Sequence, residues 1–209
     1  MKPPRAQWTP VELKILDRLK TPLDVQGFLN EVGYSPDKFA RSPRRVMKDR
    51  KANCYDGALF AAAALRRQGY PPLLLDLRAV RDDDHVLALF ARRQCWGSVA
   101  KSNFVGLRYR EPIHRSLREL AISYFNDYFN TAGEKTLRGY SARAFDLSKH
   151  DALDWMTSDD GLDELGERLD RARHVPLLDA RQVAGLAPVD ARTLEAGLVG
   201  SVKDGLFEV

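Results

Sequence analysis

The sequence is poor in cysteine and has no long apolar run, and each shortage excludes a class of protein. Its 209 residues include two cysteines, Cys54 and Cys95, which are too few for a disulfide framework and fit a reducing compartment. No apolar stretch approaches the ~20 residues that a membrane-spanning helix needs. The basic residues 1–5 are not followed by the apolar stretch of a secretory signal. We therefore expect a cytoplasmic protein with no membrane partner.

Histidine is also scarce, and glycine-rich phosphate-binding loops are missing. Of the four histidines, three have no partner pattern, namely His114, His150 and His174. Neither CxxC nor HxxxH spacing occurs, which argues against a zinc site. We expect no metal and no cofactor, and His85 remains as the histidine with chemical interest.

The net charge of +4 is modest but unevenly distributed. The basic segment 41–51 carries six basic residues and one acid, whereas residues 146–170 carry nine acids and two basic residues. Two solvated faces would explain this pattern. Alternatively, the basic segment raises the potential around Cys54 or binds an acidic partner. Aromatic residues do not interleave with it, which argues against a nucleic-acid partner.

Apolar periodicity predicts an α+β fold. A central helix carrying Cys54 should pack on a small antiparallel sheet, with flanking helices, because helical spacing gives way to short meandering strands and then returns. Residues 34–52 should form a loop or short helical turns. We expect one domain over residues 1–145 and a helical extension over 146–209 packed on it. The expected helices cover 11–20, 22–32, 54–68 and 115–129, and the expected strands cover 73–80, 85–91, 96–101 and 137–147.

Cys54 has the position of an activated thiol. Asn53 is a preferred N-cap residue, which makes Cys54 the first helical residue and Asp56 the third. The free N–H groups and the helix dipole there favour a thiolate and can stabilise an oxyanion. Asp56 opposes the thiolate electrostatically, so we assign it a structural role as a cap or as an anchor for the preceding loop.

His85 heads an apolar strand directly after three aspartates, and a base in that position needs an orienting group. If residues 92–95 close a hairpin with a two- or four-residue loop, cross-strand partners sum to about 187, which places Ser102 opposite His85. A three-residue loop would substitute Lys101 or Asn103. By chemistry Asn103 is preferred, because its amide oxygen can accept from an imidazole N–H.

The strings NCYDGALFAAAALRRQGYPPLLLDL, DHVLALF and WGSVAKSN together resemble the core of the transglutaminase-like superfamily, a relative of papain-like cysteine proteases. In that superfamily a Cys opens the central helix, an acid often follows two residues later, a His begins a strand, and an Asp or Asn lies on the next strand. Cys54, Asp56 and His85 match. No Asp occurs between Trp96 and Arg110, so Asn103 or Ser102 would be the third member. The resemblance covers residues 45–110.

The resemblance implies a papain-like core and a cysteine hydrolase or acyltransferase that forms a thioester acyl-enzyme. Its substrate would be a peptide or a small acyl compound with an amide or ester bond, and no cofactor is implied. The alternative is a catalytically impaired scaffold of the same fold that binds a protein or another acidic partner.

Overall fold

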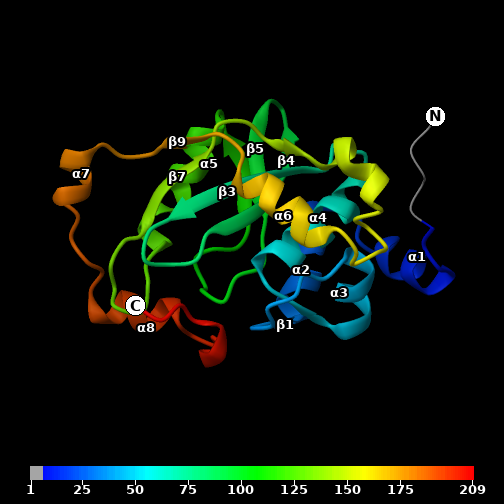
Figure 1. The fold of residues 1–209 in the computed structure, drawn as a ribbon, viewed down its shortest axis with the longest axis horizontal. Helices are drawn as coiled ribbons and strands as arrows, with labels where there is room; N and C mark the ends of the chain where they lie inside the picture. The colour runs from blue at the N-terminus through cyan, green and yellow to red at the C-terminus, as the bar shows by residue number, and fades with distance from the viewer. Residues whose placement is uncertain (1–6) are drawn as a thin grey trace.

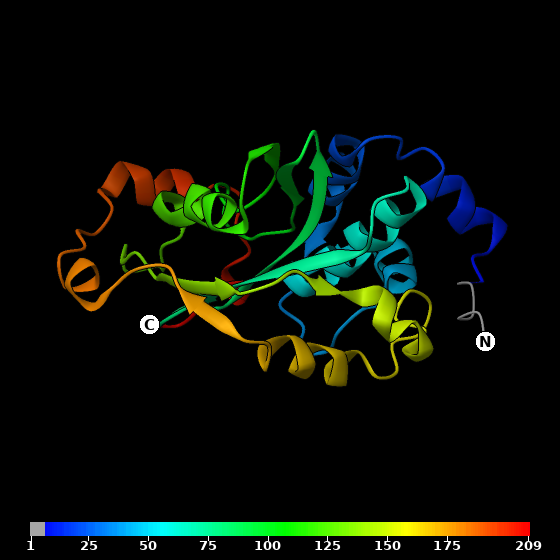
Figure 2. The same cartoon turned by 90° about the horizontal axis from the view of Figure 1, so that it is seen from above.

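The structure is a computed structural model that describes residues 7–209. Within them a seven-stranded antiparallel sheet packs against helices, which confirms the α+β class. Figure 1 shows α1–α4 and α6 gathered at one end of the molecule and α7 and α8 at the other. Figure 2 shows the twist of the sheet between them. None of the helices in this part of the chain combines the length and the apolar character required to cross a bilayer.

Helix α4 (Cys54–Arg67) is the central helix, and it begins at the predicted residue. The Asn53 side chain accepts from the N–H of Asp56, and the Asp56 carboxylate accepts from the N–H of Asn53, which is a capping box. Every residue from Asp56 to Leu65 is buried. The alanines among them carry small side chains, which allow strand β4 (His85–Arg92) to approach the helix closely.

Three shorter helices precede α4, and each starts at a hydroxyl N-cap followed by proline. They are α1 (Pro10–Leu16), α2 (Pro22–Glu31) and α3 (Pro43–Asp49). Residues 34–52, expected as a loop or helical turns, contain α3 and the parallel strand pair β1 (Gly33–Tyr34) and β2 (Lys51–Ala52). This pair brings the loop after β1 beside the start of α4.

The large sheet has the order β6-β5-β4-β3-β7-β9, and β8 also pairs with β3. Strands β4 and β5 (Cys95–Val99) form a hairpin whose two turn residues, Arg93 and Gln94, have positive φ. Its partners run from Ala88↔Val99 to Arg92↔Cys95 and sum to 187, which confirms the predicted register. Strand β5 ends at Val99, three residues earlier than the position opposite His85. The other strands are β3 (Leu73–Ala79), β6 (Arg110–His114), β7 (Leu137–Ser141), β8 (Phe145–Asp146) and β9 (His174–Pro176).

The two faces of β4 bury different clusters. Val86, Ala88 and Phe90 join the core under α4, whereas Leu87 and Leu89 join a second core with helix α5 (Leu117–Tyr124). Successive strand residues alternate between faces, so His85 starts on the α5 side. This alternation sets the face of the sheet from which the His85 side chain projects.

The chain after residue 145 is integrated into the same body. β8 spans the expected boundary, β9 pairs with β7, and three leucines of α6 (Leu162–Asp170) are buried in the core under α4. The expected extension is therefore not purely helical. The 3₁₀ helix η1 (Phe125–Asp127) lies before this extension. The remaining elements of the extension are η2 (Leu147–Leu153), α7 (Ala180–Ala184), α8 (Ala191–Gly197) and η3 (Lys203–Gly205).

Candidate active site

Cys54 is the first residue of α4, where backbone N–H groups have no partner within the helix. In the described part of the chain the N–H groups of Cys54 and Tyr55 make no backbone hydrogen bond, whereas the N–H of Asp56 is taken by Asn53. The N–H of Tyr55 and the positive end of a 14-residue helix therefore lie beside the sulfur.

The thiol itself is protonated at rest. Its Sγ lies 3.7 Å from the carbonyl oxygen of Asp84, to which the thiol donates. Burial raises the pKa of Cys54 to about 12, and the N–H groups of Val86 and Tyr55 only partly offset this, while the carboxylate of Asp83 adds to it. The helix N-terminus alone therefore does not produce a thiolate in this state.

His85 is buried and neutral. Its Nε2 lies 2.8 Å from the carbonyl oxygen of Leu107, and its ring meets those of Tyr124 and Tyr128 edge-on at 6.3 Å between centroids. A carbonyl oxygen can only accept, so Nε2 carries the proton and Nδ1 is the unprotonated nitrogen of the neutral ring. Burial lowers the pKa of His85 to about 4, because the charged ring would be desolvated.

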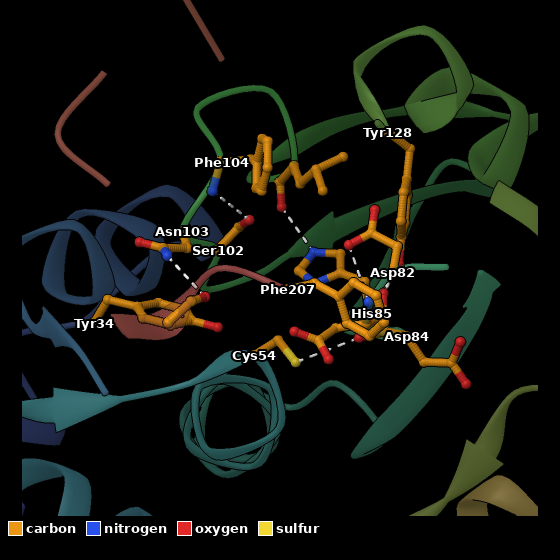
Figure 3. A pocket seen from close by; sticks show the side chains of 13 residues that line it. Tyr34, Cys54, Asp82, Asp84, His85, Ser102, Asn103, Phe104, Tyr128 and Phe207 are labelled. Carbon is orange, nitrogen blue, oxygen red and sulfur yellow. Dashed lines mark hydrogen bonds between the residues drawn. The ribbon is translucent and has the colours of Figure 1, made fainter. Parts of the chain in front are cut away.

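Cys54 and His85 line one pocket with an empty volume of about 410 Å³. Cys54 enters it from the start of α4, and His85 enters it from the α5 side of the sheet, at the point where β4 begins (Figure 3). The thiol is hydrogen-bonded to Asp84 and the imidazole to Leu107. The structure therefore brings the two predicted residues to one pocket with both still neutral.

Ser102 and Asn103 do not orient the imidazole. The Oγ of Ser102 accepts from the N–H of Phe104, and the amide of Asn103 turns away from His85 to bind the backbone of residues 202–205 (Figure 3). The reason is that β5 ends at Val99, so the chain has left the sheet before it reaches these residues. This corrects the expected third member: the imidazole partner is the main chain of Leu107.

A segment from the far end of the sequence covers the pocket. Residues 202–207, called the crossing segment below, contribute Gly205 and Phe207 to the lining of the pocket. The same two residues also line a larger outer cleft, of about 840 Å³ empty volume, which again includes Cys54. The crossing segment thus forms part of the wall of both the pocket and the outer cleft, next to Cys54.

Asp56 has the structural role expected for it. Its buried carboxylate accepts from the backbone N–H of Arg41 at 2.7 Å as well as from Asn53, and it lies 3.7 Å from the Arg41 guanidinium. Burial raises the pKa of Asp56 to about 6. The carboxylate therefore anchors the loop before α3 to the start of α4.

The basic segment 41–51 is largely neutralised inside the molecule. Arg41 pairs with Asp37 and Asp49 as well as with Asp56, and Arg44 pairs with Glu12. Two further pairs, Arg45–Asp159 and Arg50–Glu31, join this segment to the acidic stretch and to α2. The arginines therefore hold this chain together and leave little charge for raising the potential at the thiol.

Sequence reasoning missed three parts of the site. The Leu107 carbonyl belongs to the backbone, which no side-chain pattern reports. Tyr34 lies at the end of β1 and Tyr128 just after η1, and their positions depend on the folded chain. The crossing segment lies some 150 residues from Cys54 in the sequence. The feature of the sequence that could have pointed to the crossing segment is Gly205, because two apolar residues follow it.

No group of three or more His, Cys, Asp or Glu side chains suited to a metal ion comes together among residues 7–209. A comparison with protein-family models gave no match, and a comparison with curated proteins gave none either.

Proposed function

We propose that this protein is a transglutaminase-like cysteine hydrolase or acyltransferase in which Cys54 forms a thioester with the acyl part of an amide or ester. One observation carries the proposal: the thiol at the start of α4 and a neutral imidazole with unprotonated Nδ1 line the same pocket. A nucleophile beside a base, with the base held by a third group, is the usual arrangement of covalent catalysis.

The neutral resting pair sets the order of events. As Sγ attacks the carbonyl carbon, the thiol proton moves to Nδ1 of His85, and the Leu107 carbonyl accepts from Nε2 and supports the imidazolium. The carbonyl oxygen becomes an oxyanion, which the N–H groups of Cys54 and Tyr55 stabilise. Collapse of this intermediate breaks the bond to the leaving amine or alkoxide, which takes the proton from His85.

Deacylation reverses these roles. A water molecule gives a proton to Nδ1 as it attacks the thioester carbonyl, and the thiolate leaves and is reprotonated by His85. An amine in place of water would give acyl transfer instead. Hydrolysis is the simpler reaction, because water is always available as the acceptor.

The competing function is a catalytically impaired scaffold, and one observation favours it. The Cys54 thiol donates to the Asp84 carbonyl, and no carboxylate or amide side chain holds the imidazole. A scaffold that binds an acidic partner through the basic segment has less support, because most of its arginines are already paired. Acyl transfer therefore remains the function that accounts for more of the pocket.

The test is hydrolysis of a p-nitrophenyl ester by the wild type and by Asn103→Asp, in which the crossing segment loses the two hydrogen bonds donated by Nδ2. We expect release of p-nitrophenol that depends on Cys54 and falls by about 100-fold in His85→Gln, the usual size of a lost acid–base group. Cys95→Ser is the matched control, because it removes the other thiol outside the pocket. Equal rates for Cys54→Ala and its parent in both backgrounds would contradict the proposal.

A further inference from the structure

The crossing segment is held by a side chain that recognises only peptide backbone. The Nδ2 of Asn103 donates to the carbonyl oxygens of Val202 and Gly205, each at 2.9 Å, and its Oδ1 accepts from the N–H of Val202 at 2.8 Å. The Asn103 side chain therefore makes all three of these hydrogen bonds with main-chain groups. An amide so placed suits any peptide of the right shape.

One position of the crossing segment accepts glycine alone. A Cβ placed on Gly205 would lie 2.6 Å from Cε1 of the Tyr34 ring and 2.9 Å from Cδ1. The next residue, Leu206, packs against the apolar cluster on the α5 face of the sheet. The cleft therefore selects a glycine facing Tyr34 followed by an apolar side chain.

The segment is held lightly for one that covers the pocket of a half-buried cysteine. Lys203 and Asp204 are exposed, and no ion pair fixes them within residues 7–209. The contacts that hold it are the Asn103 hydrogen bonds, the fit of Gly205 on Tyr34 and the packing of Leu206. Segments of this kind, with few buried contacts, open at low cost.

We propose that the cleft over Cys54 binds a peptide backbone with a Gly–apolar pair, and that the crossing segment occupies this site within the same chain and closes the pocket. A peptide substrate would displace it and place its own carbonyl next to Cys54. The substrate class rests on the proposed function, but the closure does not: alkylation of the thiol requires no turnover. The two claims can therefore fail separately: the alkylation rate tests the closing segment, and ester hydrolysis tests acyl transfer.

The experiment measures alkylation of Cys54 by iodoacetamide in full-length protein carrying Cys95→Ser, so that one thiol remains. Asn103→Asp keeps the side-chain shape but removes both donors, and Gly205→Ala places a methyl group against Tyr34. Gly27→Ala is the matched control, because a Cβ there meets nothing within 4 Å. Rates are taken well below the melting temperature of each variant.

We expect alkylation about tenfold or more faster in Asn103→Asp and Gly205→Ala, and unchanged in Gly27→Ala. A peptide with the sequence of residues 201–209, SVKDGLFEV, should restore slow alkylation to the two opened variants, which an unfolded protein could not show. A scrambled peptide should not. Wild-type rates in both variants would overturn the proposal, and so would faster alkylation that the two peptides affect equally.

Discussion

The Nε2 atom of His85 lies 2.8 Å from the carbonyl oxygen of Leu107, and this contact fixes which nitrogen of the imidazole can act as a base. A main-chain carbonyl replaces the carboxylate or amide side chain expected on the third strand. It holds the tautomer with the proton on Nε2. It also carries no net charge, so its hydrogen bond only partly offsets the burial that lowers the pKa of His85.

Alkylation of Cys54 should reveal a protonated thiol. With its pKa raised to about 12 by burial, the thiolate fraction should rise about tenfold per pH unit from pH 7 to 10. Iodoacetamide rates in the Cys95→Ser background should follow this rise without levelling off. A plateau between pH 5 and 8 would show a preformed thiolate–imidazolium pair, and levelling near pH 9 would show an ordinary exposed thiol.

Acid should destabilise the protein through His85. Its pKa falls from 6.5 to about 4 on folding, so the unfolded chain binds the proton more tightly. The stability from the neutral ring is complete above pH 6.5 and is lost as pH falls toward 4, by about 3 kcal/mol. Urea unfolding of the wild type and of His85→Gln at pH 7 and pH 4.5 isolates this loss, because the raised pKa of Asp56, which acts in the opposite direction, is common to both proteins. In His85→Gln, whose amide cannot titrate, the difference between the two pH values should be smaller, and an equal difference contradicts the assignment.

Gly57→Ala should destabilise the start of α4. A Cβ at Gly57 would lie 2.3 Å from the Cβ of Lys101, whose Nζ donates to the carbonyl of Leu29. Overpacking of this kind costs about 1–3 kcal/mol. Gly27→Ala in α2 meets open space and should stabilise the protein by roughly 0.5–1 kcal/mol, as expected for glycine replaced within a helix. Urea midpoints for the two variants should therefore move in opposite directions.

Asp56→Ala should cost far more than Asp37→Ala, although both carboxylates pair with Arg41. Asp56 is buried, and its loss leaves the backbone N–H groups of Arg41 and Asn53 without their acceptor, whereas the Arg41 guanidinium keeps Asp37 and Asp49. Leaving a buried donor without its acceptor costs about 1–3 kcal/mol for each group. Asp37 is 35% exposed, so solvent screens its pair with Arg41 and little loss of stability is expected there. Similar free energies of unfolding for the two variants would contradict the anchoring role of Asp56.

The local features of the site could be predicted because they depend on neighbours in the sequence. The cap at Asn53, the first helical position of Cys54 and the strand start at His85 all follow from short-range patterns. The hairpin register followed from its turn. Asn103 could not be placed in this way, because its position depends on where β5 stops, and no short-range pattern sets the end of that strand at Val99.

Long-range contacts limited the prediction elsewhere. Residues 174–176 join the large sheet as β9, and the crossing segment returns to Asn103 after about 100 residues. Neither contact leaves a local pattern. The basic segment shows the same limit, since its charge suggested a binding surface until the structure placed Asp159 and Glu12 against its arginines.

The most direct measurement of the central claim is trapping of the acyl-enzyme. Full-length Cys95→Ser, with and without Asn103→Asp, is mixed with p-nitrophenyl acetate, quenched in acid and analysed by intact and peptide mass spectrometry. The account predicts one acetyl group on Cys54 that forms and then decays, more abundant in the Asn103→Asp background and strongly reduced by His85→Gln. Absence of acetyl-Cys54 in both backgrounds, with acetylation only on lysines, would contradict it.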